Sequence, residues 1–118
     1  MAKILLIDDT DNLRSLAKRM LSHFEFIEAP NAIDGLELLT KHDFEIGLIL
    51  LDYKMPKMNG YQFCQRVHES EEFNGASKIP IVGIGSFPED QREYLKACHP
   101  KIWDFNALRA SVEKHYIP

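Results

Sequence analysis

Short apolar runs alternate with segments of helical periodicity along the whole chain. Residues 4–7 form a continuous apolar run, which is typical of a strand buried on both faces of a sheet. The apolar residues that follow recur three and four positions apart and share one helix face; they are Leu13, Leu16, Ala17, Met20 and Leu21. The start of the chain therefore predicts a strand followed by a helix.

The same alternation continues to the end of the chain. Further strands are predicted at residues 24–29, 46–51, 79–84 and, with little apolar material, 101–103. Asn31 is expected to cap the second helix, and Gly60 lies at the start of the third. Ser86 and Glu89 form the Ser-x-x-Glu pattern of a capping box, which predicts a fourth helix that ends near residue 97.

Five strand–helix units, the last with Leu108 and Val112 on its helix, predict an α/β fold. Repeated strand–helix–strand units give a parallel sheet with right-handed crossovers and helices on both faces. Such sheets bind ligands at the carboxyl ends of their strands. The residues directly after each apolar run are therefore the first candidates for function.

Composition narrows the class of protein. A length of 118 residues predicts a single domain, residues 1–118. The content of 45% hydrophobic and 27% charged residues is typical of a globular chain. A net charge of -4 without a basic run argues against direct nucleic-acid binding. Two cysteines and no apolar run of membrane-spanning length predict a cytoplasmic protein with no membrane insertion.

Carboxylates follow two of the predicted strands. Asp8 and Asp9 come after the first strand, and Asp52 comes after the third, its expected neighbour in a doubly wound sheet. Three anions in one small cleft repel unless a cation lies among them, and Mg²⁺ prefers such oxygen ligands. The alternative interpretation is that these residues only end strands and cap the helix that follows.

The segment from Asp52 to Gly60 is the most specific motif in the chain. Its sequence is Asp-x-x-Met-Pro-x-Met-x-Gly, in which Pro56 ends the strand and Gly60 permits a tight entry into the next helix. With the Asp8-Asp9 pair and the order of the five units, this motif resembles response-regulator receiver domains over nearly the whole chain. The resemblance implies a flavodoxin-like, doubly wound five-stranded parallel sheet of strand order 2-1-3-4-5.

The resemblance also implies a role for each acidic residue. Asp52 matches the carboxylate that accepts a phosphoryl group from a histidine kinase, a phosphotransfer protein or a small phosphodonor. Asp9 matches a direct ligand of Mg²⁺, Asp8 a ligand acting through water, and Lys54 the position whose backbone carbonyl completes the metal shell. Such a domain is a signalling module and not an enzyme in the ordinary sense, although it assists its own phosphoryl transfer and hydrolysis.

The chain departs from the family pattern at the end of the fourth strand. Receiver domains usually carry a Thr or Ser there, and alignment on the strand places Gly85 at that position. Ser86 is one residue later and is a candidate substitute for the hydroxyl. The capping box predicted above is the preferred role of Ser86.

A second departure concerns the Lys-Pro pair that usually ends the fifth strand. The preferred register keeps the spacing from Asp52 and places Phe105-Asn106 there, which leaves the site without its lysine. The other register shortens the fourth helix and makes Lys101 the candidate lysine. Lys54 or Lys57, in the acceptor loop, could also substitute.

Two functions of different classes follow from these observations. The first is a phosphoaccepting receiver of a two-component pathway, which at this length would act on a downstream protein target. The second is a pseudo-receiver, a protein-interaction module that works without phosphorylation. A flavin or nucleotide site on the same fold is disfavoured because Asp8-Asp9 would repel a phosphate and no Gly-rich loop follows the first strand.

Overall fold

The computed structural model describes residues 1–100 and 104–118. Five parallel strands form one sheet in the order β2-β1-β3-β4-β5, as the sequence predicts. The strands are β1 (Lys3–Ile7), β2 (Phe26–Ala29), β3 (Ile46–Asp52), β4 (Ile81–Ile84) and β5 (Ala97–His99). The α-helices in the described residues are α1 (Asp11–Met20), α2 (Ala32–His42), α3 (Gly60–Glu69) and α4 (Phe105–His115).

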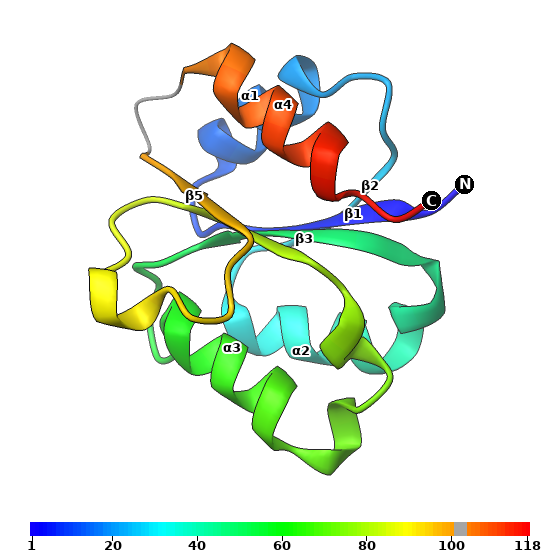
Figure 1. Cartoon of the computed structure of the whole chain (residues 1–118), viewed down its shortest axis with the longest axis vertical. Coiled ribbons are helices and arrows are strands. Elements are labelled where there is room, and N and C mark those ends of the chain that lie inside the picture. The colour runs from blue at the N-terminus through cyan, green and yellow to red at the C-terminus, as the bar shows by residue number, and fades with distance from the viewer. Residues whose placement is uncertain (101–103) are drawn as a thin grey trace.

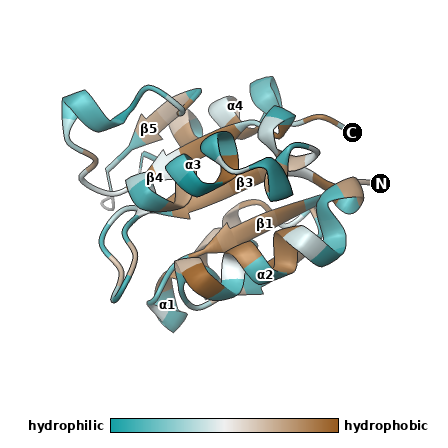
Figure 2. Cartoon of the chain, turned by 90° about the horizontal axis from the view of Figure 1, so that it is seen from below, coloured by the Kyte–Doolittle hydropathy of each residue, from teal (hydrophilic) through white to brown (hydrophobic). Residues whose placement is uncertain are grey.

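The molecule has three layers, with the sheet in the middle. Helices α1 and α4 cover one face of the sheet, and α2 and α3 cover the other (Figure 1). Alternate residues of β1 face opposite sides of the sheet. Ile4 and Leu6 pack with α1 and α4, whereas Leu5 and Ile7 pack with α2 and α3. Burial on both faces explains the continuous apolar runs, and Figure 2 shows the resulting hydrophobic middle layer.

Side-chain caps set the starts of α2 and α3. The Asn31 side chain accepts a hydrogen bond of 2.8 Å from the Asp34 backbone N–H, as predicted. At α3, Asn59 and Gln62 form a reciprocal capping box. Gly60 is required directly after this cap, because a Cβ there would lie 2.4 Å from the Asp52 carbonyl oxygen. The loop after β3 and the start of α3 therefore meet at a position that only glycine fits.

The predicted fourth helix is wrong. Instead of a helix from Ser86 to residue 97, the chain forms a single 3-10 turn at Glu89–Gln91, preceded by Pro88, and the exposed Ser86 is not its cap. The Arg92 guanidinium donates two hydrogen bonds, of 2.9 and 2.7 Å, to the Phe87 carbonyl oxygen. These bonds engage a carbonyl that a helix would have used in its own hydrogen-bond ladder.

The burial of Phe87 explains why residues 86–97 do not form a helix. Its side chain is buried against the sheet, where a Cβ on Gly83 would lie 2.9 Å from its ring and a Cβ on Gly60 would lie 2.7 Å from it. The Tyr53 ring packs beside it with a centroid distance of 5.0 Å. Two glycines thus open a slot in the α2–α3 side of the core, and Phe87 fills it.

The fifth strand also differs from the preferred prediction. β5 pairs with β4 in the register Val82↔Ala97 and Ile84↔His99. Phe105, which was expected near the end of this strand, is the first residue of α4 behind the capping residue Asp104. Residues 86–96 form turns and one 3-10 turn instead of the predicted helix, and they return the chain to the sheet edge in time for β5 to begin at Ala97. Residues 101–103, expected as the strand, lie outside the described part of the chain.

Aromatic contacts attach the 86–96 segment to α3. The Tyr94 ring stacks on His68 with a centroid distance of 4.6 Å, and its hydroxyl donates to Glu69 over 3.0 Å. The Tyr61 hydroxyl donates to Glu93 over 2.6 Å, which raises the pKa of Tyr61 to about 12. Polar and stacking contacts therefore hold the segment beside α3.

The stacked His68 predicts a loss of stability in mild acid. Burial of its ring lowers the pKa of His68 below 6.5. The smaller effect of the Glu69 charge raises this pKa, and that of the Lys96 charge lowers it further. A histidine with a lowered folded pKa stabilises the fold above pH 6.5 and loses that contribution as the pH falls through the folded pKa. His68→Gln should therefore reduce the pH dependence of the free energy of unfolding between about pH 7.5 and 5.

Urea unfolding at the two pH values measures this effect, with the exposed His23→Gln as the matched control. The readout is the difference between the two pH values within each variant. An equal difference in His68→Gln and in the parent protein would contradict the role of His68.

Candidate functional site

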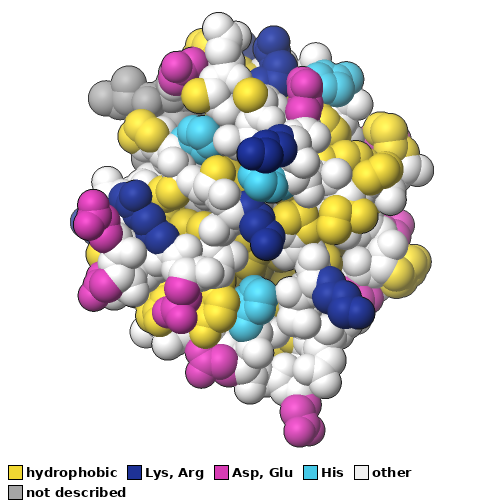
Figure 3. Space-filling model, viewed as in Figure 1, with side chains coloured by type: hydrophobic (Ala, Val, Ile, Leu, Met, Phe, Trp, Pro, Cys, Tyr) yellow, Lys and Arg dark blue, Asp and Glu magenta, His cyan; other side chains and the backbone are white. Residues whose placement is uncertain are grey.

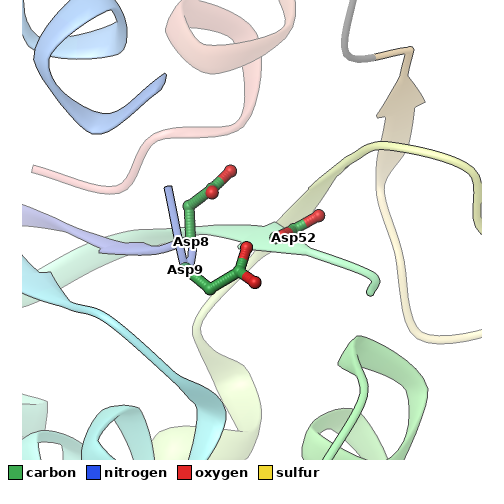
Figure 4. Close-up of side chains that lie close together, drawn as sticks. All are labelled: Asp8, Asp9 and Asp52. Carbon is green, nitrogen blue, oxygen red and sulfur yellow. The ribbon is translucent and has the colours of Figure 1, made fainter. Parts of the chain in front are cut away.

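Three carboxylates lie together at the carboxyl ends of β1 and β3. One oxygen each from Asp8, Asp9 and Asp52 can be chosen so that all three lie within 4.8 Å of one another. The register brings them together, because Ile7 pairs with Leu51 and the next residues are Asp8 and Asp52. Figure 4 shows the Asp9 side chain directed toward Asp52, with Asp8 beside it.

The three carboxylates differ in exposure. Asp8 and Asp52 are 0% and 1% exposed, whereas Asp9 is exposed to solvent. Buried carboxylates are costly unless charge or hydrogen bonds compensate them. Oxygen-only ligands in this number suit Mg²⁺, which accepts a few carboxylates and completes its shell with other oxygens. The donor set therefore fits this ion.

An open cleft of about 730 Å³ leads to the acidic cluster. Asp9 and Asp52 lie in its wall, together with the loop residues Tyr53 to Pro56 and with Gly85 and Ser86. Lys54 and Ser86, both named from the sequence, thus line the same cleft as the Asp52 carboxylate, and both are exposed. Lys57, the other candidate from this loop, is not among the residues that line this cleft, and Lys101 lies outside the described residues.

The loops around the cleft are held by specific backbone contacts. The Gly60 N–H donates to the Tyr53 carbonyl over 2.7 Å, which closes the loop between β3 and α3. Gly85 has a φ of 110°, and its N–H donates to the His99 carbonyl over 2.7 Å. A threonine at position 85 would be strained at that φ, so the position aligned with the family's hydroxyl residue needs glycine in this chain.

His99 is a residue near the site that the sequence interpretation missed. It ends β5, is followed by Pro100, and shares one row of the sheet with Ile84 and Asp52. Its Nε2 lies 2.7 Å from the Ser111 hydroxyl of α4, and burial lowers its pKa despite the opposing charge of Asp104. Pro100, directly after His99, is the available signal in the sequence, because a proline often follows the end of a strand or helix.

Comparison with protein families gives the class of this chain. Residues 4–105 match the response regulator receiver domain. The chain belongs to that family. A receiver domain explains the fold and the position of the acidic cluster together, and it makes this chain a signalling domain of the two-component type. In the part of the receiver domain that the structure describes, no helix is long and apolar enough to cross a membrane.

Curated relatives of this receiver domain include chemotaxis proteins. It is 33% identical over 85 residues to the sensor histidine kinase CheAY of Helicobacter pylori, covering 70% of this chain but only 10% of the kinase. It is 27% identical over 90 residues to a CheY homolog of Campylobacter jejuni, covering 74% of this chain and 68% of that protein.

Solved structures share the fold of this receiver domain. The chemotaxis protein CheY4 of Vibrio cholerae aligns with a TM-score of 0.78 and 22% identity over 98% of both chains. The response regulator TrrA of Thermotoga maritima, solved in complex with Mg²⁺ and BeF, aligns with a TM-score of 0.82 and 22% identity. That alignment covers 97% of this chain and 98% of TrrA.

Proposed function

We propose that this receiver domain accepts a phosphoryl group on Asp52, with Mg²⁺ held by the acidic cluster, and signals through contacts with other proteins. The observation that carries the proposal is the convergence of Asp8, Asp9 and Asp52 at one end of an open cleft. The donor is a histidine kinase, a phosphotransfer protein or a small phosphodonor. The receiver acts in the cytoplasm on a downstream protein target.

Asp52 has the placement that a nucleophile needs. It ends a rigid central strand, and the cleft gives a donor access to its carboxylate. In the reaction, one Asp52 oxygen bonds to phosphorus while the bond between phosphorus and the donor atom breaks, and the donor leaves with the electron pair. Positioning and charge neutralisation, rather than proton transfer, limit such reactions.

The neighbouring residues supply positioning and charge compensation. Mg²⁺, when bound, would neutralise charge on the phosphoryl oxygens and on the carboxylates. The candidate groups that hold the ion are the carboxylates of Asp8, Asp9 and Asp52 and the Lys54 carbonyl. Ser86 lines the cleft, and its hydroxyl is the candidate donor of a hydrogen bond to a phosphoryl oxygen. Water reaches the same open cleft, so the acyl phosphate is expected to hydrolyse there.

The test of this proposal is the intact mass of the protein after incubation with acetyl phosphate, with and without Mg²⁺. The expected result is a mass increase of one phosphoryl group that depends on Mg²⁺. No mass increase with either acetyl phosphate or phosphoramidate would refute it and would favour the pseudo-receiver, which binds partners without phosphorylation.

Surface charge supports a protein partner rather than a nucleic acid. On the face drawn in Figure 3, Lys and Arg side chains are dispersed among acidic and apolar ones instead of forming one basic patch. The whole chain carries a net charge of -4. Nucleic-acid surfaces gather positive charge to contact phosphates.

Asp9→Asn should weaken Mg²⁺ binding by roughly tenfold or more, since groups that merely support metal ligands already change affinity about 10–100-fold. Asp9 is the exposed member of the cluster and lines the cleft, so a hydrated ion meets it first. Calorimetric titration measures the affinity. Asp90→Asn, which removes an exposed carboxylate outside the cluster, is the control of equal charge.

Mg²⁺ should also stabilise the parent protein against heat, because the ion binds only the folded state. This rise in Tm should shrink in Asp9→Asn and persist in Asp90→Asn. Equal Mg²⁺ affinity in the parent protein and in Asp9→Asn would remove Asp9 from the metal site.

A further inference from the structure

The Arg14 side chain on α1 joins the acidic cluster to the neighbouring strand β2. Its Nη1 donates to the Asp8 carbonyl oxygen over 2.6 Å, and its Nε donates to Glu28 over 3.3 Å. Its Nη2 contacts the Asp11 carboxylate. The side chain is only 13% exposed. All three guanidinium nitrogens are therefore engaged in a partly buried setting.

The partners of Arg14 come from different elements and fix its orientation. Glu28 lies on β2 opposite Leu6, and its second oxygen accepts a bond of 2.8 Å from Lys18. Asp11 lies in the first turn of α1. A guanidinium is planar and presents its donors in a rigid fork, so three simultaneous contacts hold it in one position. The two carboxylates also offset its charge.

The Asp8 carbonyl is a sensitive point of the site. It belongs to the planar peptide unit that joins Asp8 to Asp9, so its direction determines where the Asp9 side chain leaves the backbone. The Asp8 carboxylate is tied separately, because it accepts a bond of 2.9 Å from the Thr10 N–H. Repulsion among three carboxylates favours rotations that spread them apart. A donor on the Asp8 carbonyl opposes such a rotation.

We propose that Arg14 is a positioning residue of the magnesium site: it holds the Asp8–Asp9 peptide so that Asp9 points toward Asp52. This inference rests on the metal binding proposed above. Arg14 itself is not a ligand, and its partner Glu28 shares the role by orienting the guanidinium.

The sign of the effect on Mg²⁺ affinity distinguishes this role from simple electrostatics. If Arg14 acted only as a nearby positive charge, its removal would strengthen the binding of a cation. If it positions Asp9, its removal weakens binding. Arg14→Gln is therefore expected to bind Mg²⁺ about tenfold more weakly than the parent protein, the scale found for groups that orient metal ligands.

The experiment is a calorimetric Mg²⁺ titration of the parent protein, Arg14→Gln, Arg14→Lys and Glu28→Gln. Arg14→Lys keeps the charge but cannot make the three contacts, so it should recover only part of the affinity. Glu28→Gln should weaken binding less than Arg14→Gln. Tyr116→Phe is the matched control, because it also removes a side-chain donor to a backbone carbonyl, that of Ala2, away from the cluster.

The outcomes separate the inference from the proposed function. A parent protein that does not bind Mg²⁺ overturns the metal site itself, and this inference with it. A parent that binds, with unchanged or stronger binding in Arg14→Gln, overturns only the role of Arg14. Equal weakening in Tyr116→Phe and Arg14→Gln would also overturn it, because the effect would then follow general stability. The Thr10 amide NMR signal without Mg²⁺ should shift in Arg14→Gln and stay in place in Tyr116→Phe.

Discussion

Asp52→Asn is expected to abolish formation of the acyl phosphate. The asparagine side chain has nearly the same size, but its neutral amide is a far weaker nucleophile than a carboxylate. Asp9 cannot replace it on the central strand, since it leaves the sheet from the turn after β1 and is exposed. We therefore expect no detectable phosphorylated species by intact mass after incubation with acetyl phosphate and Mg²⁺.

Asp90→Asn is the matched control for this variant, because it makes the same chemical change at an exposed residue outside the cluster. It should be phosphorylated like the parent protein. Circular dichroism checks that Asp52→Asn is folded. A folded Asp52→Asn protein that still gains a phosphoryl group would place the acceptor on another residue and reject the assignment of Asp52.

The centre of the fold and the acidic cluster were predictable because their signals are local. β1 and β3 are continuous apolar runs, and both are buried on both faces. In a parallel sheet, neighbouring strands end at the same edge, so the residues after β1 and β3 had to meet there. The spacing in the sequence was therefore enough to bring Asp8, Asp9 and Asp52 together.

The segment after β4 was not predictable in the same way. Ser86 and Glu89 carry a valid local signal for a helix start, but the burial of Phe87 overrides it. The slot for Phe87 depends on Gly60 and Gly83, one of them far away in the sequence. Because the structure of this segment depends on such a distant contact, the local periodicity of the sequence does not reveal it.

The missed position of His99 follows from that first error. A helix predicted up to residue 97 leaves no room for a strand at residues 97–99, so the strand is expected only at residues 101–103. In the structure the segment consists of turns with one 3-10 turn, and β5 ends at His99. The residue that ends β5 is therefore a histidine, with its Nε2 2.7 Å from the Ser111 hydroxyl, and not the phenylalanine of the preferred register.

Phe87→Ala is expected to destabilise the fold strongly. The Phe87 side chain is 2% exposed and fills the slot above Gly60 and Gly83 beside Tyr53. Removing a buried phenylalanine ring typically costs about 3–5 kcal/mol of unfolding free energy, because burial is lost and a cavity remains. Urea unfolding measures the loss, and the slope of the transition shows whether the two-state behaviour is kept.

The control is Phe105→Ala, which removes the same ring from a position that is 47% exposed. Substitutions at exposed positions usually change stability by less than about 0.5 kcal/mol. A loss of under about 1 kcal/mol in Phe87→Ala would mean that the 86–96 segment can collapse into the slot. Phe87 would then not be its anchor, and the contacts of Tyr94 and Arg92 would have to hold the segment in place of a fourth helix.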